Sequence, residues 1–429
     1  MSDNAPLHGR PAGGGFHYAY LIVLSGIVIT CVPCALVLSC AGIFFTPVST
    51  YFGVSKATFS LYFSILNAAM MVALPVAGRL MERLDMRLVL SACVLMAGGG
   101  LVAFSTFGEM WQFYVVGAVL GFGLAPLLYL AVPALVNAWC VRRVGFFVGL
   151  CMAFTGIGGV IFNPLGSALI ASGPEGWRTA YLVFGLIILV VTLPFTALVV
   201  RGRPADKGLE PYGAEVAAAA GETVAARGLS ATRAMRSPAF YALALLCGLF
   251  TLNQTVYQFL PSYVTSLSEG GLPSLAAMTG TVASACMAGQ AIGKVALGTI
   301  SDRSASAGLA GGLACGVAGV LVMMLVPSVS ALLLAGAFLF GFAYACTTVQ
   351  TPLLTRTVFG ELDYTAIYSR VSMVGSLFGA VAAVFWGWVC DLPDGYIVMF
   401  ALSLACMVAC LALGLFALGQ RKRLEREYE

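Results

Sequence analysis

Charge is what this sequence most lacks. Only 9% of its 429 residues are Asp, Glu, Lys or Arg, and 60% are apolar, whereas about 25% charged residues is usual in a soluble domain. A soluble chain of this length needs a polar surface, and these residues do not supply one. The sequence therefore predicts an integral membrane protein. Its 22 basic and 18 acidic residues nearly balance, so no basic field exists to bind nucleic acid.

Histidine is almost absent as well. His8 and His17 are the only two, and both precede the first apolar run, so we expect no histidine-based metal site or proton relay in the membrane. The 13 cysteines are odd in number and scattered along apolar runs, which favours packing residues over a disulfide framework. Cys31 and Cys34 form a CxxC inside an apolar run, outside any redox or zinc-binding context. We therefore expect no metal and no cofactor.

Long apolar runs are abundant. A helix that spans a bilayer needs about 20 apolar residues, and continuous runs of this length are unlike the alternating ten-residue strands of a membrane barrel. The sequence predicts an all-α polytopic membrane protein with twelve transmembrane helices. The runs cover residues 18–46, 57–79, 88–107, 111–136, 146–171, 179–200, 239–265, 274–299, 308–327, 330–355, 367–390 and 395–419.

Basic residues divide unequally between the two sides of the predicted membrane. With both termini cytoplasmic, nearly all Lys and Arg fall in cytoplasmic loops or tails, as the positive-inside rule requires. Only Lys56 and Arg178 fall on the outside, and Lys294 lies within a run. The bias predicts a multi-pass protein of the plasma membrane or a bacterial inner membrane.

The longest polar stretch joins the sixth run to the seventh and divides the chain into two halves. We expect a cytoplasmic linker there, with a short surface helix over Ala214 to Ala226. The predicted organisation is an N-terminal tail (1–17), a six-helix bundle (18–200), the linker (201–238), a second six-helix bundle (239–419) and a C-terminal tail (420–429).

A short motif is repeated at the same turn of each half. Gly78-Arg79-Leu80-Met81-Glu82-Arg83 follows the second run, and Gly298-Thr299-Ile300-Ser301-Asp302-Arg303 follows the eighth. Two copies of G-x-x-x-acid-Arg at equivalent positions indicate an internal duplication and two pseudo-symmetric bundles. We interpret the motif as a conformational element. In this interpretation Gly78 and Gly298 allow close helix approach. The acid and the arginine of each copy, Glu82 with Arg83 and Asp302 with Arg303, supply an ion pair that can break.

Twelve runs, a central linker and paired G-x-x-x-[DE]-R loops resemble the major facilitator superfamily. Three further features narrow the resemblance to the branch of monocarboxylate transporters and oxalate:formate exchangers. They are the segment Trp139-Cys140-Val141-Arg142-Arg143-Val144-Gly145, the glycines that follow it, and Gly176-Trp177-Arg178. The resemblance implies two bundles that rock about a central cavity. The chain departs from the family pattern at Glu82, where Asp is usual, and at Asp85, where a second Gly is usual.

Lys294 is the only charged residue well inside a run. An intramembrane charge costs at least about 2.5–3.5 kcal/mol on insertion scales and marks a functional site by default. In the families that the chain resembles, a basic residue four positions before the Gly of the second loop motif binds the substrate carboxylate, and Lys294 stands four before Gly298. The usual residue is Arg, which binds a carboxylate through two N–H groups. The alternative is that Lys294 snorkels to a membrane surface roughly 10 Å away.

Gln290 lies one helical turn before Lys294, on the same face. Its position resembles that of an Asp in monocarboxylate transporters, which pairs with the basic residue and carries a proton. An amide cannot titrate, and the runs contain no other interior Asp or Glu. Substrate exchange or facilitated diffusion needs no such group.

Other polar residues inside the runs are further candidates, because such residues usually face a bundle interior. Tyr129 lies ten residues before Trp139, the spacing at which oxalate:formate exchangers place a substrate-contacting Tyr. Those exchangers also carry a second basic residue in the eleventh run, where 372–376 here has none, which favours a monoanion. About half of such polar residues link helices instead of binding ligands. The remaining candidates are Asn67, Asn253, Tyr257 and Tyr344.

These observations predict a monomeric membrane transporter that works by alternating access. Its expected substrate is a small organic anion, a monocarboxylate, and its candidate co-substrates are a counter-anion and a proton. One alternative is an exporter of an amphipathic or neutral compound in which Lys294 is structural. A membrane enzyme is not expected, because the runs lack a constellation of catalytic acids, histidines and nucleophiles.

Overall fold

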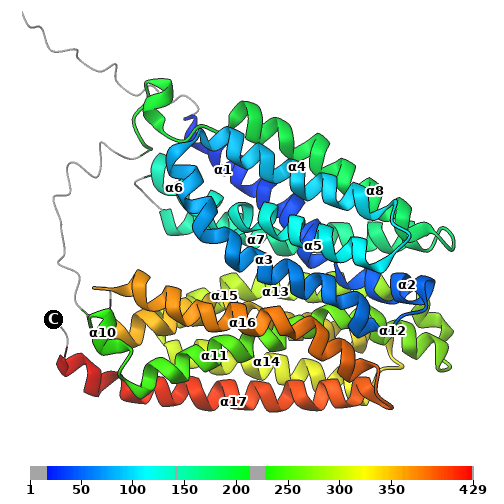
Figure 1. The fold of residues 1–429 in the computed structure, drawn as a ribbon. Helices are drawn as coiled ribbons and strands as arrows, with labels where there is room; N and C mark the ends of the chain where they lie inside the picture. Colours follow the sequence, from blue (N-terminus) through cyan, green and yellow to red (C-terminus); the bar gives the residue numbers. More distant parts are fainter. Residues whose placement is uncertain (1–16, 141–143, 213–227, 361, 428–429) are drawn as a thin grey trace, which may run out of the picture.

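The computed structural model describes residues 17–140, 144–212, 228–360 and 362–427 (Figure 1). This part of the chain is helical and contains twelve helices, some of them interrupted, that are long and apolar enough to cross a membrane. The predicted fold class and number of spans are confirmed. Numbered in chain order, the spans are Ala19–Phe52, Lys56–Leu74, Met86–Phe104, Met110–Trp139, Phe146–Ile170, Gly176–Val199, Pro238–Glu269, Pro273–Ser301, Ala305–Leu325, Ser330–Phe359, Ala366–Cys390 and Gly395–Leu424.

The spans form two groups that lie one above the other in Figure 1. The upper group, here the N-half, contains α1 (Ala19–Ile29), α2 (Gly42–Phe52), α3 (Lys56–Arg83), α4 (Met86–Phe104), α5 (Met110–Ala125), α6 (Val132–Trp139), α7 (Val144–Ile170) and α8 (Gly176–Ile187). The lower group, here the C-half, contains α11 (Pro238–Gln254), α12 (Leu260–Glu269), α13 (Thr279–Arg303), α14 (Ala305–Leu325), α15 (Ser330–Phe359), α16 (Tyr364–Cys390) and α17 (Gly395–Leu424). Helix α10 (Ala231–Ala234) precedes α11 at the C-half's edge.

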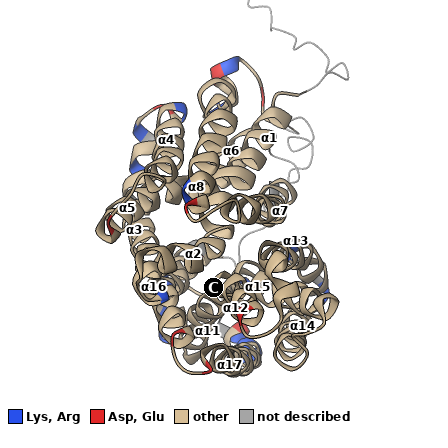
Figure 2. Cartoon of the chain, turned by 90° about the vertical axis from the view of Figure 1, so that its right-hand side faces the viewer, with Lys and Arg blue, Asp and Glu red and all other residues tan. Residues whose placement is uncertain are grey.

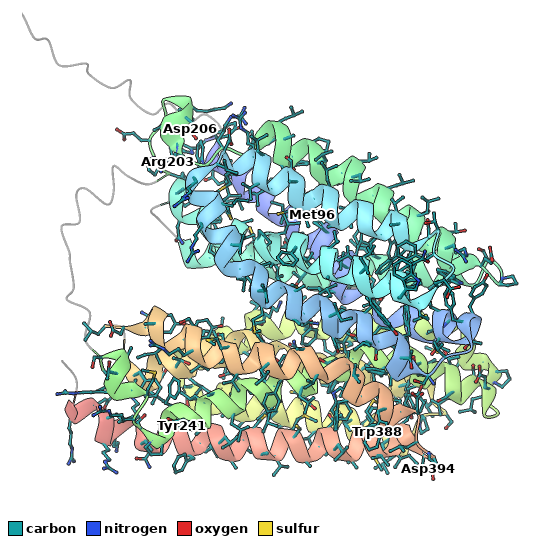
Figure 3. All side chains as sticks on the ribbon, in the orientation of Figure 1. Met96, Arg203, Asp206, Tyr241, Trp388 and Asp394 are labelled. Atoms are coloured by element: carbon teal, nitrogen blue, oxygen red, sulfur yellow. The ribbon has the colours of Figure 1, made fainter. Side chains whose placement is uncertain are left out.

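The two ends of the molecule differ in how the halves meet. We call the end that carries Arg203 and Asp206 the linker end, and the end that carries Trp388 and Asp394 the opposite end (Figure 3). The ribbons of the halves diverge toward the linker end and converge toward the opposite end (Figure 1). The helix pairs that join the halves include α7 with α13, α3 with α16, and α2 with α12.

The first span is interrupted near its middle. Pro33 lies inside it, and proline lacks the N–H that continues the α-helical ladder. Residues Thr30–Ser39 wind as wider π-helical turns, with Cys40 N donating to Ala35 O over 3.0 Å. The chain resumes as α2 at Gly42. At the end of the π-helical segment, the Leu38 carbonyl accepts from the Tyr257 hydroxyl of the C-half.

The described parts of the linker are bound to both halves. Tyr212 N donates to Trp139 O over 2.8 Å, at the end of span 4, and Leu229 N donates to Phe359 O over 2.9 Å, at the end of span 10. Ala231 N also donates to Asp363 Oδ2 over 2.8 Å. The linker therefore docks on equivalent helix ends of the two halves. The surface helix expected over Ala214 to Ala226 lies outside the described residues.

The two loop motifs lie at equivalent helix ends at the linker end. Helix α3 ends at Arg83 and α13 ends at Arg303. A Cβ atom added at Gly78 or Gly298 would meet nothing within 4 Å, so in this conformation neither glycine is a point of close helix approach, contrary to our interpretation. The side chains of Glu82 and Asp302 lie outside what the structure describes.

Asp85, where the family pattern has a second Gly, starts the next helix. Its Oδ1 accepts from Arg87 N over 2.9 Å, which caps α4, and its Oδ2 pairs with Arg87 Nη2 at 2.6 Å. The hydrogen bonds from Arg87 hold the pKa of the Asp85 carboxyl below its ordinary value. Because the folded-state pKa is lowered, this cap stabilises the loop above the ordinary carboxylate pKa and is lost as pH falls through the lowered one.

Candidate functional site

Lys294 lies on α13 and reaches across to the N-half. Its Nζ donates to Thr155 Oγ1 over 3.2 Å and to Met152 O over 3.3 Å, both on α7. Thr155 is near the middle of that helix. None of the ion pairs among the described residues includes Lys294. The side chain thus carries a cation into the space between the halves, where neutral oxygen atoms are its acceptors.

Gln290 lies one turn away on the same helix, and its side chain is 2% exposed. Its Oε1 is buried with no hydrogen-bond partner. The side chain lies beside the Tyr344 hydroxyl and against Gly156 of α7, where an added Cβ would collide with it. An unsatisfied buried amide oxygen is costly, so this position offers an acceptor for a donor group on a ligand.

Tyr257 and Tyr344 form a stacked pair. Their ring centroids are 5.0 Å apart and their planes are inclined by 13°. The Tyr257 hydroxyl donates a hydrogen bond to Leu38 O, at the end of the π-helical segment of span 1. The structure therefore brings together Gln290, Tyr257 and Tyr344 from spans 8, 7 and 10, facing the break in span 1.

The remaining candidates lie elsewhere. Asn253 is 1% exposed and accepts from Ser403 Oγ over 2.6 Å, which joins span 7 to span 12. Asn67 donates to its own helix at Phe63 O over 2.8 Å and lies opposite Gly379 of α16. Asn253 is placed between helices of one half, whereas Asn67 lies at the contact between the halves.

Tyr129 occupies the π-helical segment Pro126–Ala131 in span 4. Tyr129 is 50% exposed, and its hydroxyl lies near Tyr368 and Cys247 of the C-half as well as Cys34 of span 1. It therefore faces the other half. No hydrogen bond joins it to Lys294 among the described contacts.

Sequence reasoning missed the acceptors on α7. Thr155 is one of only two hydroxyl residues in the apolar helix α7, the other being Ser167. Met152 contributes a backbone carbonyl that no side-chain pattern reveals. The signal nearby is the glycine run that we used only for family resemblance. A Cβ at Gly156 would lie 2.9 Å from Ala291 Cβ, and one at Gly159 would lie 3.0 Å from Met287 Cβ, so these glycines let α7 approach α13 closely.

Contacts between the halves are concentrated toward the opposite end. Thr46 Oγ1 donates to Ser262 Oγ over 2.7 Å, and Ser60 Oγ donates to Ala383 O over 3.0 Å. Lys56 pairs with Asp391 at 4.0 Å. The helices of the halves form two groups when viewed from this end, with charged residues mainly at helix ends and in loops (Figure 2). These contacts join the halves there, whereas the ribbons of the halves diverge at the linker end, which we call the open side (Figure 1).

A cavity of about 780 Å³ lies near the opposite end, between spans 1, 5, 7 and 8. Its walls come from both halves, and its polar lining consists of hydroxyl groups such as those of Thr46, Ser167 and Ser262. Lys294 is not part of its lining. The cavity and the Lys294 site are therefore separate features of the interface.

Twelve spans in two halves, with a cation at the interface between them, define a polytopic membrane transporter rather than an enzyme. The chain belongs to the Major Facilitator Superfamily, whose family profile matches residues 27–361. The predicted family is confirmed.

Individual relatives agree with this assignment. The chain is 27% identical to monocarboxylate transporter 12 of Rattus norvegicus over 180 residues, which are 42% of this chain and 36% of that protein. It is 31% identical to human (Homo sapiens) monocarboxylate transporter 6 over 153 residues, 35% of this chain and 30% of that protein. The chain thus spans about a third of the length of these curated relatives.

Solved structures share the fold. A bacterial homolog of the human lysosomal transporter Spinster, inward-facing and unoccupied, superposes with a TM-score of 0.68 at 16% identity, covering 97% of this chain and 98% of that one. A variant of the nucleoside transporter NupG superposes with a TM-score of 0.72 at 12% identity, covering 94% and 99%. At these identities the likeness concerns the fold alone.

Proposed function

We propose that this protein transports a small organic anion, a monocarboxylate, by alternating access, with Lys294 as the charge partner of the carboxylate. The observation that carries the proposal is that Lys294 lies between the halves and, among the described residues, binds neutral acceptors only. No carboxylate among the described ion pairs binds this ammonium, so it is available to pair with an incoming anion. The two relatives named monocarboxylate transporters support the substrate class.

The neighbourhood of Lys294 favours a monoanion. The stacked pair of Tyr257 and Tyr344 offers an apolar surface, and Gln290 offers an amide beside it. One cation with an apolar surface suits a molecule with a single carboxylate and an apolar body. Because Gln290 cannot titrate, we propose anion exchange or facilitated diffusion without obligatory proton coupling.

The proposed orientation follows from the basic residues. We propose that the linker end, with both chain termini, faces the cytoplasm of a plasma or bacterial inner membrane. The open side of this conformation is then the cytoplasmic side. The transporting unit is proposed to be the monomer, since each chain carries both halves of the site.

Uptake into proteoliposomes tests the proposal. We expect wild-type protein to transport at least one of acetate, pyruvate and benzoate in preference to oxalate and succinate. We expect Lys294→Gln to lower that uptake about thirtyfold or more, because removing one charge of a desolvated pair costs about 2 kcal/mol or more. Uptake that follows an imposed proton gradient would contradict exchange or facilitated diffusion.

A second candidate function is export of an amphipathic or neutral compound. It is favoured by the two hydrogen bonds that Lys294 already makes, since these bonds suit a structural lysine as well. In that case Lys294→Ala leaves transport intact, and none of the carboxylates in the panel is a substrate.

A further inference from the structure

The acceptors of Lys294 belong to the half that does not carry it. Lys294 is on α13, whereas Thr155 Oγ1 and Met152 O, at 3.2 and 3.3 Å from its Nζ, are on α7. A lysine ammonium has three N–H donors. Two of them are therefore used at the interface, and one remains for another acceptor.

These contacts lie where α7 and α13 cross. One residue after Thr155, a Cβ at Gly156 would collide with the Gln290 side chain and lie 2.9 Å from Met287 O. Toward the linker end the helices separate, because a Cβ at Gly149 on α7 or at Gly298 on α13 would meet nothing within 4 Å. Lys294 thus lies where contact between the halves ends and the open side begins.

Thr155 is itself held in one orientation. Its hydroxyl donates to Met152 O over 2.8 Å, so the lone pairs of Oγ1 are left to accept from Lys294. Its backbone carbonyl accepts from Ser39 Oγ over 3.3 Å, which ties this turn of α7 to span 1. Three spans therefore determine where the Thr155 oxygen lies.

We propose that Thr155 is a positioning residue for the anion site. With Met152 O it holds the ammonium of Lys294 so that the third N–H remains for the substrate carboxylate. One presented N–H matches one carboxylate oxygen, and this geometry makes Thr155 a determinant of monocarboxylate affinity. The inference rests on the proposed function and adds a residue from the N-half to the site.

Replacing the hydroxyl while keeping the side-chain shape tests this role. For the carboxylate of the panel that wild-type protein transports best, we expect Thr155→Val to raise KM about tenfold with little change in maximal rate, because a hydrogen bond to a charged group is lost. Thr155→Ser retains the oxygen and is expected to restore the wild-type KM. Thr251→Val is the matched control, because among the described contacts the Thr251 hydroxyl binds its own helix, at Cys247 O.

An unchanged KM in Thr155→Val overturns the proposal, and so does an equal rise in the Val and Ser variants. A second measurement needs no substrate. In detergent, we expect Thr155→Val to lower Tm more in the wild-type background than in a Lys294→Met background, where only the bond from Thr155 to Met152 O is lost. Additive shifts in Tm overturn the contact itself. If Lys294→Gln transports carboxylate normally, the proposed function fails, while the Tm cycle still reports whether Thr155 holds Lys294.

Discussion

Lys294 shows how a membrane protein can keep a charge without neutralising it. A buried ammonium with no acceptor is costly, and a carboxylate partner would cancel its charge. Thr155 Oγ1 and Met152 O instead supply two neutral acceptors. These bonds reduce the cost of burial without a carboxylate partner, which leaves the ammonium able to pair with the anion that we propose as substrate.

Gly156 supports this arrangement by letting α7 and α13 approach. We expect Gly156→Ala to lower both Tm and carboxylate uptake, because the added methyl group collides with Gln290 and overpacking costs about 1–3 kcal/mol. The control is Gly149→Ala, two turns earlier on the same helix, where the methyl group has open space. Thermal unfolding in detergent and proteoliposome uptake measure both effects. Wild-type behaviour of Gly156→Ala would contradict the close approach of the helices.

At the scale of elements, the broken first span is the part of the N-half that meets Tyr257. Pro33 lies in the π-helical segment, and the Leu38 carbonyl at its end accepts from the Tyr257 hydroxyl of span 7. On its other side, Ser39 Oγ binds α7 at Thr155 O. Span 1 therefore connects the aromatic pair in the C-half with the turn that holds Lys294.

Removing the Tyr257 hydroxyl tests this connection. We expect Tyr257→Phe to retain the ring stack on Tyr344, to lose about 1 kcal/mol of stability, and to change the uptake rate because a contact between the halves is lost. Tyr263→Phe is the control, since its hydroxyl binds Met323 O within the C-half over 2.8 Å. Both variants are expected to lower Tm, and only Tyr257→Phe to alter uptake. Equal uptake in the two variants would argue against a role of this contact in transport.

At the scale of the molecule, the halves are joined at the opposite end and open at the linker end. The Thr46–Ser262 hydrogen bond and the Lys56–Asp391 ion pair both bridge the halves there. An exposed ion pair contributes little by itself, about 0–1 kcal/mol. A closure made of several weak contacts is easily reversed, as alternating access requires.

Cross-linking tests whether this end must open. In a background without the 13 native cysteines, we expect a short bifunctional thiol reagent to stop uptake by a variant with Thr46→Cys and Ser262→Cys, and a reductant that cleaves the link to restore it. The control pair is Ser91→Cys with Thr196→Cys, whose hydroxyls are 3.2 Å apart within the N-half. Uptake that continues in the cross-linked Thr46–Ser262 variant would show that the halves need not separate there.

Much of the fold was predictable because its signals are local in sequence. Runs of about 20 apolar residues determine spans wherever they fold, and the paired motifs ending at Arg83 and Arg303 place equivalent helix ends in both halves. The candidate site was less predictable. In the sequence, Tyr257, Tyr344, Gln290 and Asn253 are all polar residues inside apolar runs and suggested the same role. In the structure the first three come together, whereas Asn253 binds Ser403 between helices of the C-half.

The sequence by itself determined the class of protein, the twelve spans, the duplication and the single interior cation, because apolar length and a lone charge can be read residue by residue. Only the tertiary structure decided which atoms Lys294 meets. Its acceptors on α7 are separated from it by 139 and 142 residues. Their meeting depends on which helix faces pack at Gly156, and that packing is a property of two folded halves in contact rather than of either segment alone.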